Sequence, residues 1–565
     1  MYIIVISCLL LSPSLYNASD NTAQDQKIIK ELESILQKNV KNQLFDGAGS
    51  IDVTVWKRNQ NQSELIPIYL KSFGKSQVAN ISKEIVHIKT RSPWNNLKDI
   101  SNRYLPAIPD VDGNMYGDAG KRNQYRIASN TKTFIGIAAD MLAEKHGLNL
   151  DEKLHPKYVN LSTLGLAHKW NIPSEKDGYL SDFPNSSKYM NAITFRHLLT
   201  HTSGLSRESK KGSQYSYGSS RTSTSKCPPN DEYQGLIDCV QTQDNNWPAW
   251  TQHVVSYMMP SCGYKGYNEM SKKQKSCLPG EYFHYSNAGY SILGLGLDSF
   301  VKKKINHSFT ITTWITEKIF KKFDMNETVF TWVDYNQEQK GKTTHGCQGG
   351  EELSACNQTR ALMDYADRGI KTPPGGIWST TVDLAKYLLN LHTLSNKSNI
   401  FEVDPNISPK TDSESEEDPT QMPSSDFKYG HGWYIAEQYS CLPEKHQTHI
   451  QGAWGTVPGF TSYMITNSKQ NENENQYVIV MLRSYNYGGR FNLGNQARRF
   501  LWRLLHPEEK LATLKCPVVV KDDFSEGDLI VQKNKRSSNS KTNFANRTLL
   551  LLFTIMTVHY CMNRL

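Results

Sequence analysis

The chain has 565 residues, 38% of them hydrophobic, which is enough to bury a large core. Its formal net charge of +9 is spread along the sequence. No stripe of Lys and Arg with interleaved aromatic residues is present, and this argues against a nucleic-acid-binding protein.

The two ends have the patterns of targeting signals. Residues 1–19 combine a short apolar run with a small, polar end, which predicts a secretory signal peptide. Residues 548–565 are mostly apolar and follow a serine-rich stretch and a polar spacer, an order typical of a glycosylphosphatidylinositol (GPI) anchor signal. Residues 506–547 then form a tail or stalk. We expect a secreted protein held on the extracellular face of the cell membrane by this C-terminal lipid anchor, with a short tail-anchor as the alternative.

A catalytic-type domain is predicted over residues 26–505. It begins with an amphipathic helix at 26–42 and continues with a β-hairpin whose strands lie at 51–56 and 69–74. Polar, irregular stretches at about 76–124, 206–278 and 404–425 predict insertions. The third is strongly acidic and is expected to be a mobile loop.

Cysteines and sequons fit an exported chain. An even number of cysteines between the terminal signals predicts disulfides, while the absence of paired C-x-x-C motifs argues against zinc. Repeated Asn-X-Ser/Thr sequons predict glycosylation. The pairing is open, and nearest-neighbour bonds would join Cys227 with Cys239, Cys262 with Cys277, Cys347 with Cys356, and Cys441 with Cys516.

The most informative segment begins at Ser129, because Lys132 follows three residues later at the start of a strongly apolar helix that should stop at Gly147. Residues three apart on a helix share one face. A helix that is apolar nearly all round is buried, and a lysine in its first turn is usually neutralised, paired or catalytic. A hydroxyl held against such an amine is one way to build a serine nucleophile without histidine.

Further elements follow along the chain. Thr194 can cap a short helix that stops at Gly204, and residues 288–300 predict a buried helix. A turn at 373–376 precedes another helix, residues 463–465 and 477–482 predict antiparallel strands, and 496–505 predicts a helix packed on the sheet. His197 and His201 lie four residues apart without a metalloprotease pattern between them, so we expect them to be structural.

Several motifs resemble the serine β-lactamase-related superfamily, which includes class C β-lactamases, D-alanyl-D-alanine carboxypeptidases, family VIII-type esterases and animal β-lactamase-like proteins. The resemblance implies an α+β fold with a central antiparallel sheet flanked by helices, beside a mostly helical subdomain. The motifs occur in the family's order at residues 126–132 (RIASNTK), 193–205 (ITFRHLLTHTSGL), 279–280 with 285–290 (PG and YSNAGY), 374–380 with 383–385, and 457–460.

The resemblance also implies roles. Ser129 is similar to the acyl-accepting nucleophile, and Lys132 to the residue that takes or relays its proton. Tyr285 resembles the group that returns the proton to the leaving group, and Asn287 the residue that orients lysine and substrate. Because an unperturbed lysine has a pKa of about 10.4, a tyrosine phenolate is the alternative base. The backbone N–H groups of Ser129 and, by position, Thr456 would form the oxyanion hole.

The third family motif departs from the pattern. In place of Lys-Thr-Gly or His-Thr-Gly this chain has Ala453-Trp454-Gly455, so the group that would meet a substrate carboxylate is missing. His449 could replace it only on a bulged strand. Some esterases of the family carry a tryptophan in this motif, so Trp454 indicates neutral ester substrates and a substrate-orienting position.

Three hypotheses follow. The first is a serine hydrolase that acts on a small-molecule or peptide ester or amide through an acyl-enzyme at Ser129, without metal or cofactor. The second is a non-catalytic cell-surface or binding protein on the same scaffold, and the third is a β-lactamase. Retention of Ser129, Lys132 and Tyr285 together favours the first.

Overall fold

A computed structural model describes residues 23–43, 49–58, 65–75, 123–161, 191–205, 279–280, 283, 285–330, 372–394, 427–436, 450–457, 460–467, 475–484, 497, 500–501 and 503–505. These all belong to one compact unit, made of residues 1–438 and 446–509. The second unit, 439–445 with 510–565, contains no described residue. The expected signal peptide, disulfides, insertions (apart from residues 123 and 124), tail and anchor signal lie outside the described residues, as does His449.

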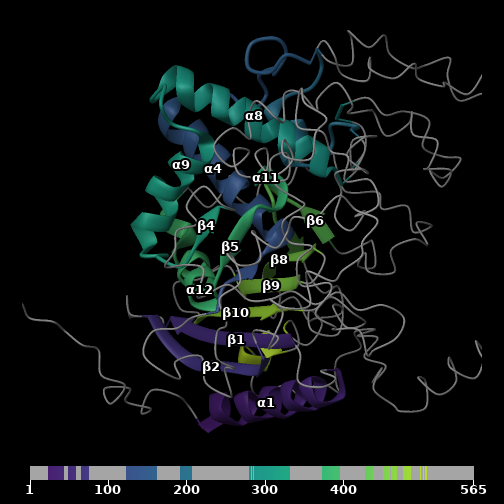
Figure 1. Cartoon of the computed structure of the whole chain (residues 1–565), viewed down its shortest axis with the longest axis vertical. Helices are drawn as coiled ribbons and strands as arrows, with labels where there is room; N and C mark the ends of the chain where they lie inside the picture. The colour runs from purple at the N-terminus through teal and green to yellow at the C-terminus, as the bar shows by residue number, and fades with distance from the viewer. Residues whose placement is uncertain are drawn as a thin grey trace, which may run out of the picture. The chain divides into compact units, whose positions relative to one another are not determined.

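Seven antiparallel strands form the main sheet in the order β2-β1-β10-β9-β8-β7-β6 (Figure 1). The predicted hairpin and the predicted antiparallel pair are both confirmed, as β1 with β2 and β9 with β10. Every residue of β10 is buried, so the middle of the sheet is covered on both faces. The strands are β1 (Gly49–Arg58), β2 (Leu65–Lys75), β6 (Phe427–Tyr429), β7 (Tyr434–Ala436), β8 (Ile450–Val457), β9 (Phe460–Asn467) and β10 (Gln476–Arg483).

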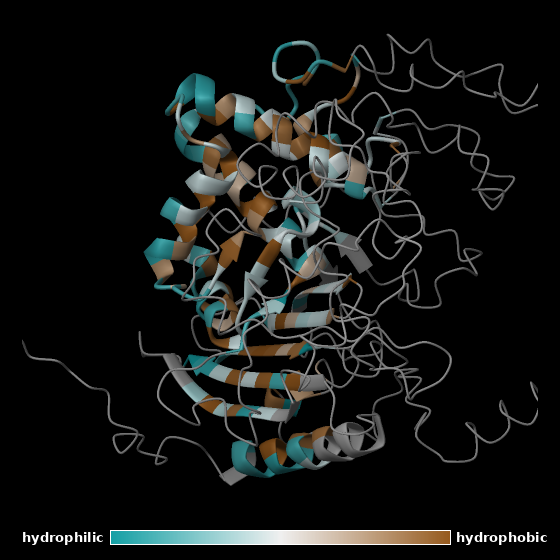
Figure 2. Cartoon of the chain, in the orientation of Figure 1, coloured by the Kyte–Doolittle hydropathy of each residue, from teal (hydrophilic) through white to brown (hydrophobic). Residues whose placement is uncertain are grey.

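Helices pack against the sheet and against one another. α1 contacts β2, α12 contacts β1, β9 and β10, and α4 contacts α8, α9 and α11. The middle of α8 is largely hydrophobic, whereas its C-terminal end is polar (Figure 2). None of the described helices is long and apolar enough to cross a membrane. The helices are α1 (Ala23–Gln43), α4 (Thr131–His146), α6 (Phe195–Leu199), α8 (Asn287–Lys304), α9 (Ile311–Ile315), α11 (Thr372–Gly375) and α12 (Thr381–Asn390), with the shorter turns η6 (Ala128–Asn130), η10 (Thr316–Phe320), η11 (Lys321–Phe323) and η15 (Leu391–Thr393).

The α4 helix forms as its sequence predicts. Its first twelve residues are all buried, and it ends at Gly147, whose φ of 72° is the left-handed conformation that glycine adopts without strain. Lys145 and His146 occupy the last turn, where positive charge is favoured by the helix dipole. Lys132 therefore lies in the first turn of a core helix, as expected.

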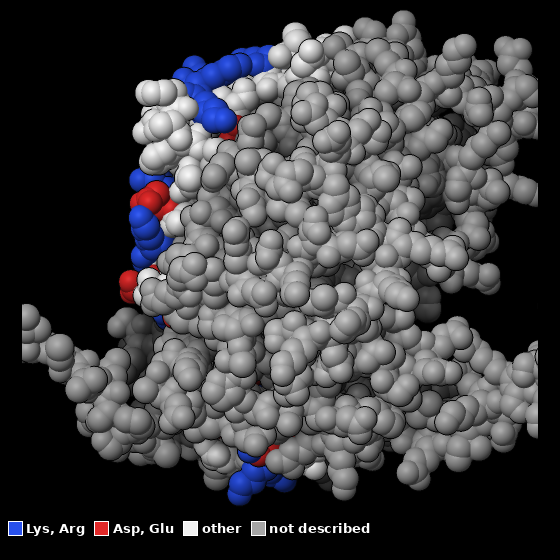
Figure 3. Space-filling model, viewed as in Figure 1, with Lys and Arg blue, Asp and Glu red and all other residues white. Residues whose placement is uncertain are grey.

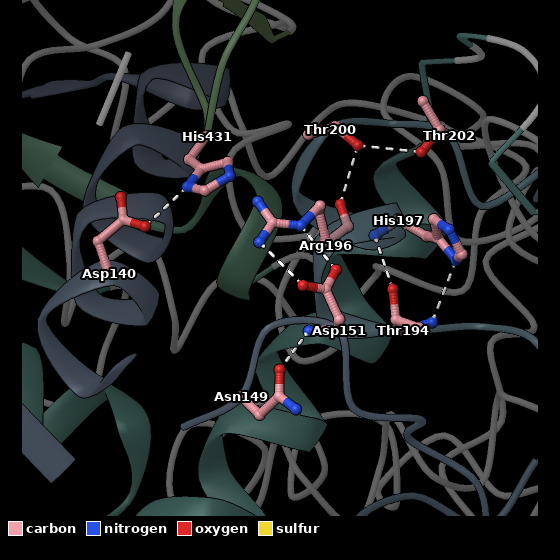
Figure 4. Close-up of polar contacts among 9 residues, drawn as sticks. All are labelled: Asp140, Asn149, Asp151, Thr194, Arg196, His197, Thr200, Thr202 and His431. Atoms are coloured by element: carbon pink, nitrogen blue, oxygen red, sulfur yellow. Dashed lines mark hydrogen bonds and ion pairs between the residues drawn. The ribbon is translucent and has the colours of Figure 1, made fainter. Parts of the chain in front are cut away.

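The end of α6 differs from the prediction. Thr194 caps the helix as expected, in a reciprocal arrangement in which its hydroxyl accepts from the His197 backbone N–H at 3.2 Å and its own N–H donates to His197 Nδ1 at 3.3 Å (Figure 4). The helix nevertheless ends at Leu199 rather than at Gly204. His201 has a φ of 59°, which is incompatible with a continuing helix and directs the chain into the turn that precedes Gly204.

A small second sheet was not predicted. It contains β3 (Tyr125–Arg126), β5 (Ile377–Ser379) and β4 (Val329–Phe330) in the order β3-β5-β4. The region expected to be only a turn before α12 contains both α11 and β5. Strands of two or three residues have no detectable periodicity, and these form because distant segments pair with one another.

An ion pair joins the first helix to the sheet. Asp25 of α1 forms a buried ion pair of 3.0 Å with Lys57 of β1.

The C-terminal turn of α8 carries three lysines, of which Lys302 pairs with Asp298 at 2.7 Å. Figure 3 shows Lys and Arg atoms along this part of the described surface. Such a run at a helix C-terminus is favoured by the helix dipole, and we interpret it as a solvated face.

Asp52 is a buried carboxyl group on β1, next to the segment that leads to Ser129. Asn123 Nδ2 donates a hydrogen bond of 3.2 Å to Asp52 Oδ2. Burial raises the pKa of Asp52 from 3.8 to about 6, against the opposing effect of hydrogen bonds from Ser72, Tyr125 and Asn123. The folded chain therefore binds this proton more tightly than the unfolded chain does.

We expect this carboxyl to make stability depend on pH. The contribution of Asp52 to the free energy of unfolding is fully present below the pKa of the unfolded chain. It falls by up to about 3 kcal/mol as the pH rises from about 4 to about 6. Asp52→Asn removes the titrating group. Urea unfolding of the wild type should therefore show a fall in free energy between about pH 4 and pH 6.5 that the Asp52→Asn variant lacks. Identical pH slopes for the two proteins would contradict this assignment.

Candidate active site

Ser129 lies in the η6 turn, between β3 and α4, and is half-buried. The preceding residue, Ala128, has a φ of 48°, a left-handed conformation that costs energy for a residue other than glycine. Ile127 is held on both sides, because its N–H donates to Ile377 O at 3.0 Å and its carbonyl accepts from Ser462 Oγ at 2.7 Å. The turn is thus fixed between β5 and β9, with the serine at the junction of the sheet and the helices.

Lys132 is 1% exposed, and its amino group contacts three acceptors. Its Nζ lies 3.1 Å from Ser129 Oγ, 2.8 Å from Asn287 Oδ1 and 2.9 Å from Pro374 O. Asn287 is the first residue of α8, and Pro374 lies in α11. Because a buried amine without polar partners is strongly disfavoured, these contacts account for a lysine in this position.

Tyr285 completes the group of predicted catalytic residues. Its hydroxyl donates to Ser129 Oγ at 2.8 Å, and Lys132 Nζ lies 4.8 Å from the centre of its ring. Tyr285 is partly exposed. The structure therefore brings Ser129 and Lys132 within hydrogen-bond reach of Tyr285 and Asn287, although the chain separates the two pairs by more than 150 positions.

Two proton routes fit this arrangement. Asn287 Oδ1 and Pro374 O only accept, so they occupy two of the N–H groups of Lys132. The third position of its Nζ faces Ser129 Oγ. A neutral amine would take the serine proton there, whereas an ammonium group would donate to the serine and leave Tyr285 as the base. The first route keeps the Tyr285 hydroxyl as donor to Ser129 Oγ, whereas the second requires its phenolate, which accepts from the serine.

Strand β8 contacts the η6 turn directly. The expected third motif does lie on a strand, and a Cβ added to Gly455 would come within 2.2 Å of Ile127 O and 2.7 Å of Ser129 N. Thr456 is the next residue, and its Oγ1 is buried without a hydrogen-bond partner in the described part of the chain. The proposed oxyanion role of the Thr456 and Ser129 backbone N–H groups stays a prediction.

Trp454 belongs to an aromatic surface on β6, β7 and β8. Its ring stacks on Tyr434 with centroids 3.7 Å apart and an interplanar angle of 19°. Tyr434 in turn packs edge-on against Tyr429, at 4.8 Å. Ala453 is buried, so this position offers a methyl group rather than a cation. The described side chains of this group are therefore apolar or aromatic and carry no charge; they are Ala453, Trp454, Tyr434 and Tyr429.

His197 and His201 do not converge on one point. His197 serves in the cap of α6, while His201 is fully buried and its Nδ1 accepts from the Ser286 backbone N–H at 3.1 Å. Among the described residues, no cluster of three or more His, Cys, Asp or Glu is placed to hold a metal ion. The contact between His201 and the segment that carries Tyr285 was not anticipated.

The carbonyl of Pro374 was missed as well. Its motif was recognised, but a backbone oxygen leaves no side-chain signal in a sequence, and its contact with Lys132 follows from the packing of α11 against α4.

Replacing Gly455 with alanine tests the contact between β8 and the η6 turn. Because the new methyl group would meet backbone atoms, we expect a loss of about 1–3 kcal/mol in the free energy of unfolding, measured in urea. We also expect Ser129 to react about 100-fold more slowly with a fluorophosphonate. Gly452→Ala, in the same strand, is the matched control, since its added Cβ would come no closer than 3.4 Å to its nearest neighbour. Equal effects of the two substitutions would contradict the close approach.

The chain has several relatives of low sequence identity. It is 25% identical over 279 residues to "Beta-lactamase-like protein 4" of Dictyostelium discoideum, which covers 49% of this chain and 37% of that protein. It is 25% identical over 381 residues to "Protein flp" of Staphylococcus aureus (strain MW2), which covers 67% of this chain and 55% of that protein. The match thus spans about half or less of the length of these relatives.

Solved structures also align with it. A penicillin-binding protein homologue from Pyrococcus abyssi has a TM-score of 0.49 and 17% identity, covering 85% of this chain and 78% of that one. D-amino acid amidase from Ochrobactrum anthropi SV3 has a TM-score of 0.46 and 15% identity, covering 85% and 97%. The sequence model of the Beta-lactamase family matches residues 111–501. Since that match spans well over half of the chain, the protein belongs to the Beta-lactamase family.

Proposed function

We propose that the protein is a serine hydrolase that transfers the acyl group of a neutral ester or amide to Ser129. The observation that carries the proposal is the position of Ser129 Oγ, 3.1 Å from Lys132 Nζ and 2.8 Å from the Tyr285 hydroxyl. A nucleophile within hydrogen-bond reach of two proton carriers is the arrangement that acyl transfer needs. Membership of the Beta-lactamase family supports the same class of reaction.

The proposed reaction follows from these contacts. Ser129 Oγ attacks the substrate carbonyl carbon and passes its proton to the neutral amine of Lys132 or to the phenolate of Tyr285. Backbone N–H groups of Ser129 and Thr456 would stabilise the oxyanion. Tyr285 then gives a proton to the leaving alcohol or amine, and the carbon–leaving-group bond breaks. Water attacks the resulting ester by the same steps in reverse, which releases the acid and restores Ser129.

The charge of the substrate is proposed from the residues near the third motif. Ala453 presents no positive charge where a substrate carboxylate would bind in a β-lactamase. The amino group of Lys132 is already engaged by Asn287, Pro374 and Ser129. Trp454 and Tyr434 add an aromatic surface. These features favour neutral, apolar acyl groups over anionic ones.

A fluorophosphonate probe tests the nucleophile. We expect it to label the wild type and not Ser129→Ala. Labelling should be about 10²–10⁴-fold slower in both Lys132→Arg and Tyr285→Phe. The guanidinium of the first variant keeps the charge but cannot act as a base. Ser299→Ala is the matched control, because Ser299 and Lys302 have the same spacing on α8, yet Lys302 pairs with Asp298 at 2.7 Å. Its labelling should equal that of the wild type.

Two results would reject the proposal. Undiminished labelling of Ser129→Ala would move the nucleophile elsewhere. A wild type that reacts with neither a fluorophosphonate, a fluorescent penicillin nor a panel of aryl esters would instead favour a non-catalytic binding protein.

Paired substrates test the expected charge preference. A phenyl ester of a neutral acid and one whose acyl chain ends in a carboxylate differ mainly in that group. We expect kcat/KM to favour the neutral ester by at least about tenfold, equivalent to about 1.4 kcal/mol. Equal or faster turnover of the anionic ester would show that another cation receives the carboxylate.

A further inference from the structure

His201 lies at the centre of a buried ring cluster beside the candidate active site. It follows α6 in a left-handed conformation, with a φ of 59°, and its side chain is fully buried. Its ring centroid is 4.3 Å from that of Tyr285, 4.9 Å from Tyr290, 4.8 Å from Tyr429 and 5.8 Å from Phe283. His201 thus contacts the predicted proton carrier directly, although the reaction outlined above assigns it no task.

A hydrogen bond fixes the protonation state of His201. The Ser286 backbone N–H donates to Nδ1 at 3.1 Å. An imidazole nitrogen accepts only when it carries no proton, so the ring is neutral with its hydrogen on Nε2. Ser286 follows Tyr285 directly and caps α8, with its Oγ accepting from the Gly289 N–H at 2.8 Å. His201 therefore holds both the ring of Tyr285 and the backbone from which it projects.

We propose that His201 is a positioning residue for Tyr285 and that it performs this task only as the neutral imidazole. The inference rests on the proposed hydrolase function. A proton on Nδ1 would replace the acceptor by a donor that faces the Ser286 N–H. It would also place a positive charge against the ring of Tyr285, which already has Lys132 Nζ 4.8 Å from its centre. The Tyr285 hydroxyl would then leave its position 2.8 Å from Ser129 Oγ.

Among the described residues, the other ionisable groups around His201 lie on α4, α8 and β6. Burial raises the pKa values of Tyr290 on α8 and Tyr429 on β6 well above the usual tyrosine value, so both phenols stay neutral. Lys132 on α4 also lies 5.4 Å from the centre of the Tyr290 ring. Asp140 on α4, which acts on Tyr290 electrostatically, is paired with His431 at 2.7 Å (Figure 4). Protonation of His201 would break its contact with the Ser286 N–H and should therefore produce an acid limb in acylation.

Two substitutions of His201 distinguish the effect of its hydrogen-bond acceptor, Nδ1, from the effect of its aromatic ring. In His201→Asn, the amide oxygen takes the place of Nδ1 one bond beyond Cγ, does not titrate, and sits on a residue that tolerates left-handed backbone. His201→Phe keeps a ring but has no acceptor. His197→Asn is the matched control, because His197 Nδ1 also accepts a backbone N–H, from Thr194 at 3.3 Å, in the cap of α6.

The rate of fluorophosphonate labelling of the full chain is the first readout. At pH 8 we expect His201→Asn to stay within about fivefold of the wild type and His201→Phe to fall by about 30-fold or more. Between pH 8 and pH 5 the wild type and His197→Asn should lose about tenfold more rate than His201→Asn, whose acceptor does not protonate. An acid limb that is unchanged in His201→Asn would overturn the proposal, and would do so even if His201→Phe fails to fold.

A second readout needs no catalysis. In protein labelled with ¹³C at tyrosine Cζ, the signal of Tyr285 is identified by its loss in Tyr285→Phe. This signal should move between pH 8 and pH 5 in the wild type and in His197→Asn, and stay in place in His201→Asn. The same movement in all three proteins would reject the role of His201. If the wild type is not labelled by any acylating probe, the hydrolase proposal fails, while this signal still decides whether His201 positions Tyr285.

Discussion

The buried amino group of Lys132 sets the strictest constraint on this structure. Removing such a group from water costs several kcal/mol unless polar atoms replace the lost hydration. Those atoms come from three separate segments, as the hydroxyl of Ser129, the side-chain carbonyl of Asn287 and the backbone carbonyl of Pro374. The η6 turn, the start of α8 and the short helix α11 must therefore meet at the first turn of α4.

Close backbone contacts make this meeting point rigid. A Cβ on Gly432 would lie 2.5 Å from Lys132 O, and a Cβ on Gly136 would lie 1.9 Å from His431 O. The turn between β6 and β7 thus touches α4 where the lysine emerges, and the buried pair of Asp140 and His431 joins the same two segments. Together with β8 against η6, these contacts place the sheet directly against the turn that carries Ser129. Small displacements of either layer would be transmitted to the serine without being absorbed by flexible side chains.

The elements that sequence reasoning found have strong local patterns. The apolar run after Lys132 predicted α4, alternation predicted β1, and strands were also predicted at the positions of β2, β9 and β10. The residues expected to carry chemistry do converge, because Ser129 and Lys132 share a helix turn and Tyr285 precedes a buried helix. The misses have physical causes. Strands β3, β5 and β4 exist only through pairing among these distant segments. The early end of α6 reflects the left-handed conformation of His201, which no local pattern predicts.

The arrangement of hydrogen-bond acceptors around Lys132 has a consequence for biosynthesis. Its acceptors are encoded at positions 129, 287 and 374, and the strand that backs the serine comes only at 450–457. A ribosome makes these parts in that order, so the contacts around Ser129 and Lys132 are complete only after most of the protein has been translated. Under the proposed reaction, a copy that fails to fold would leave the alcohol of Ser129 unactivated and would not attack other esters in the cell.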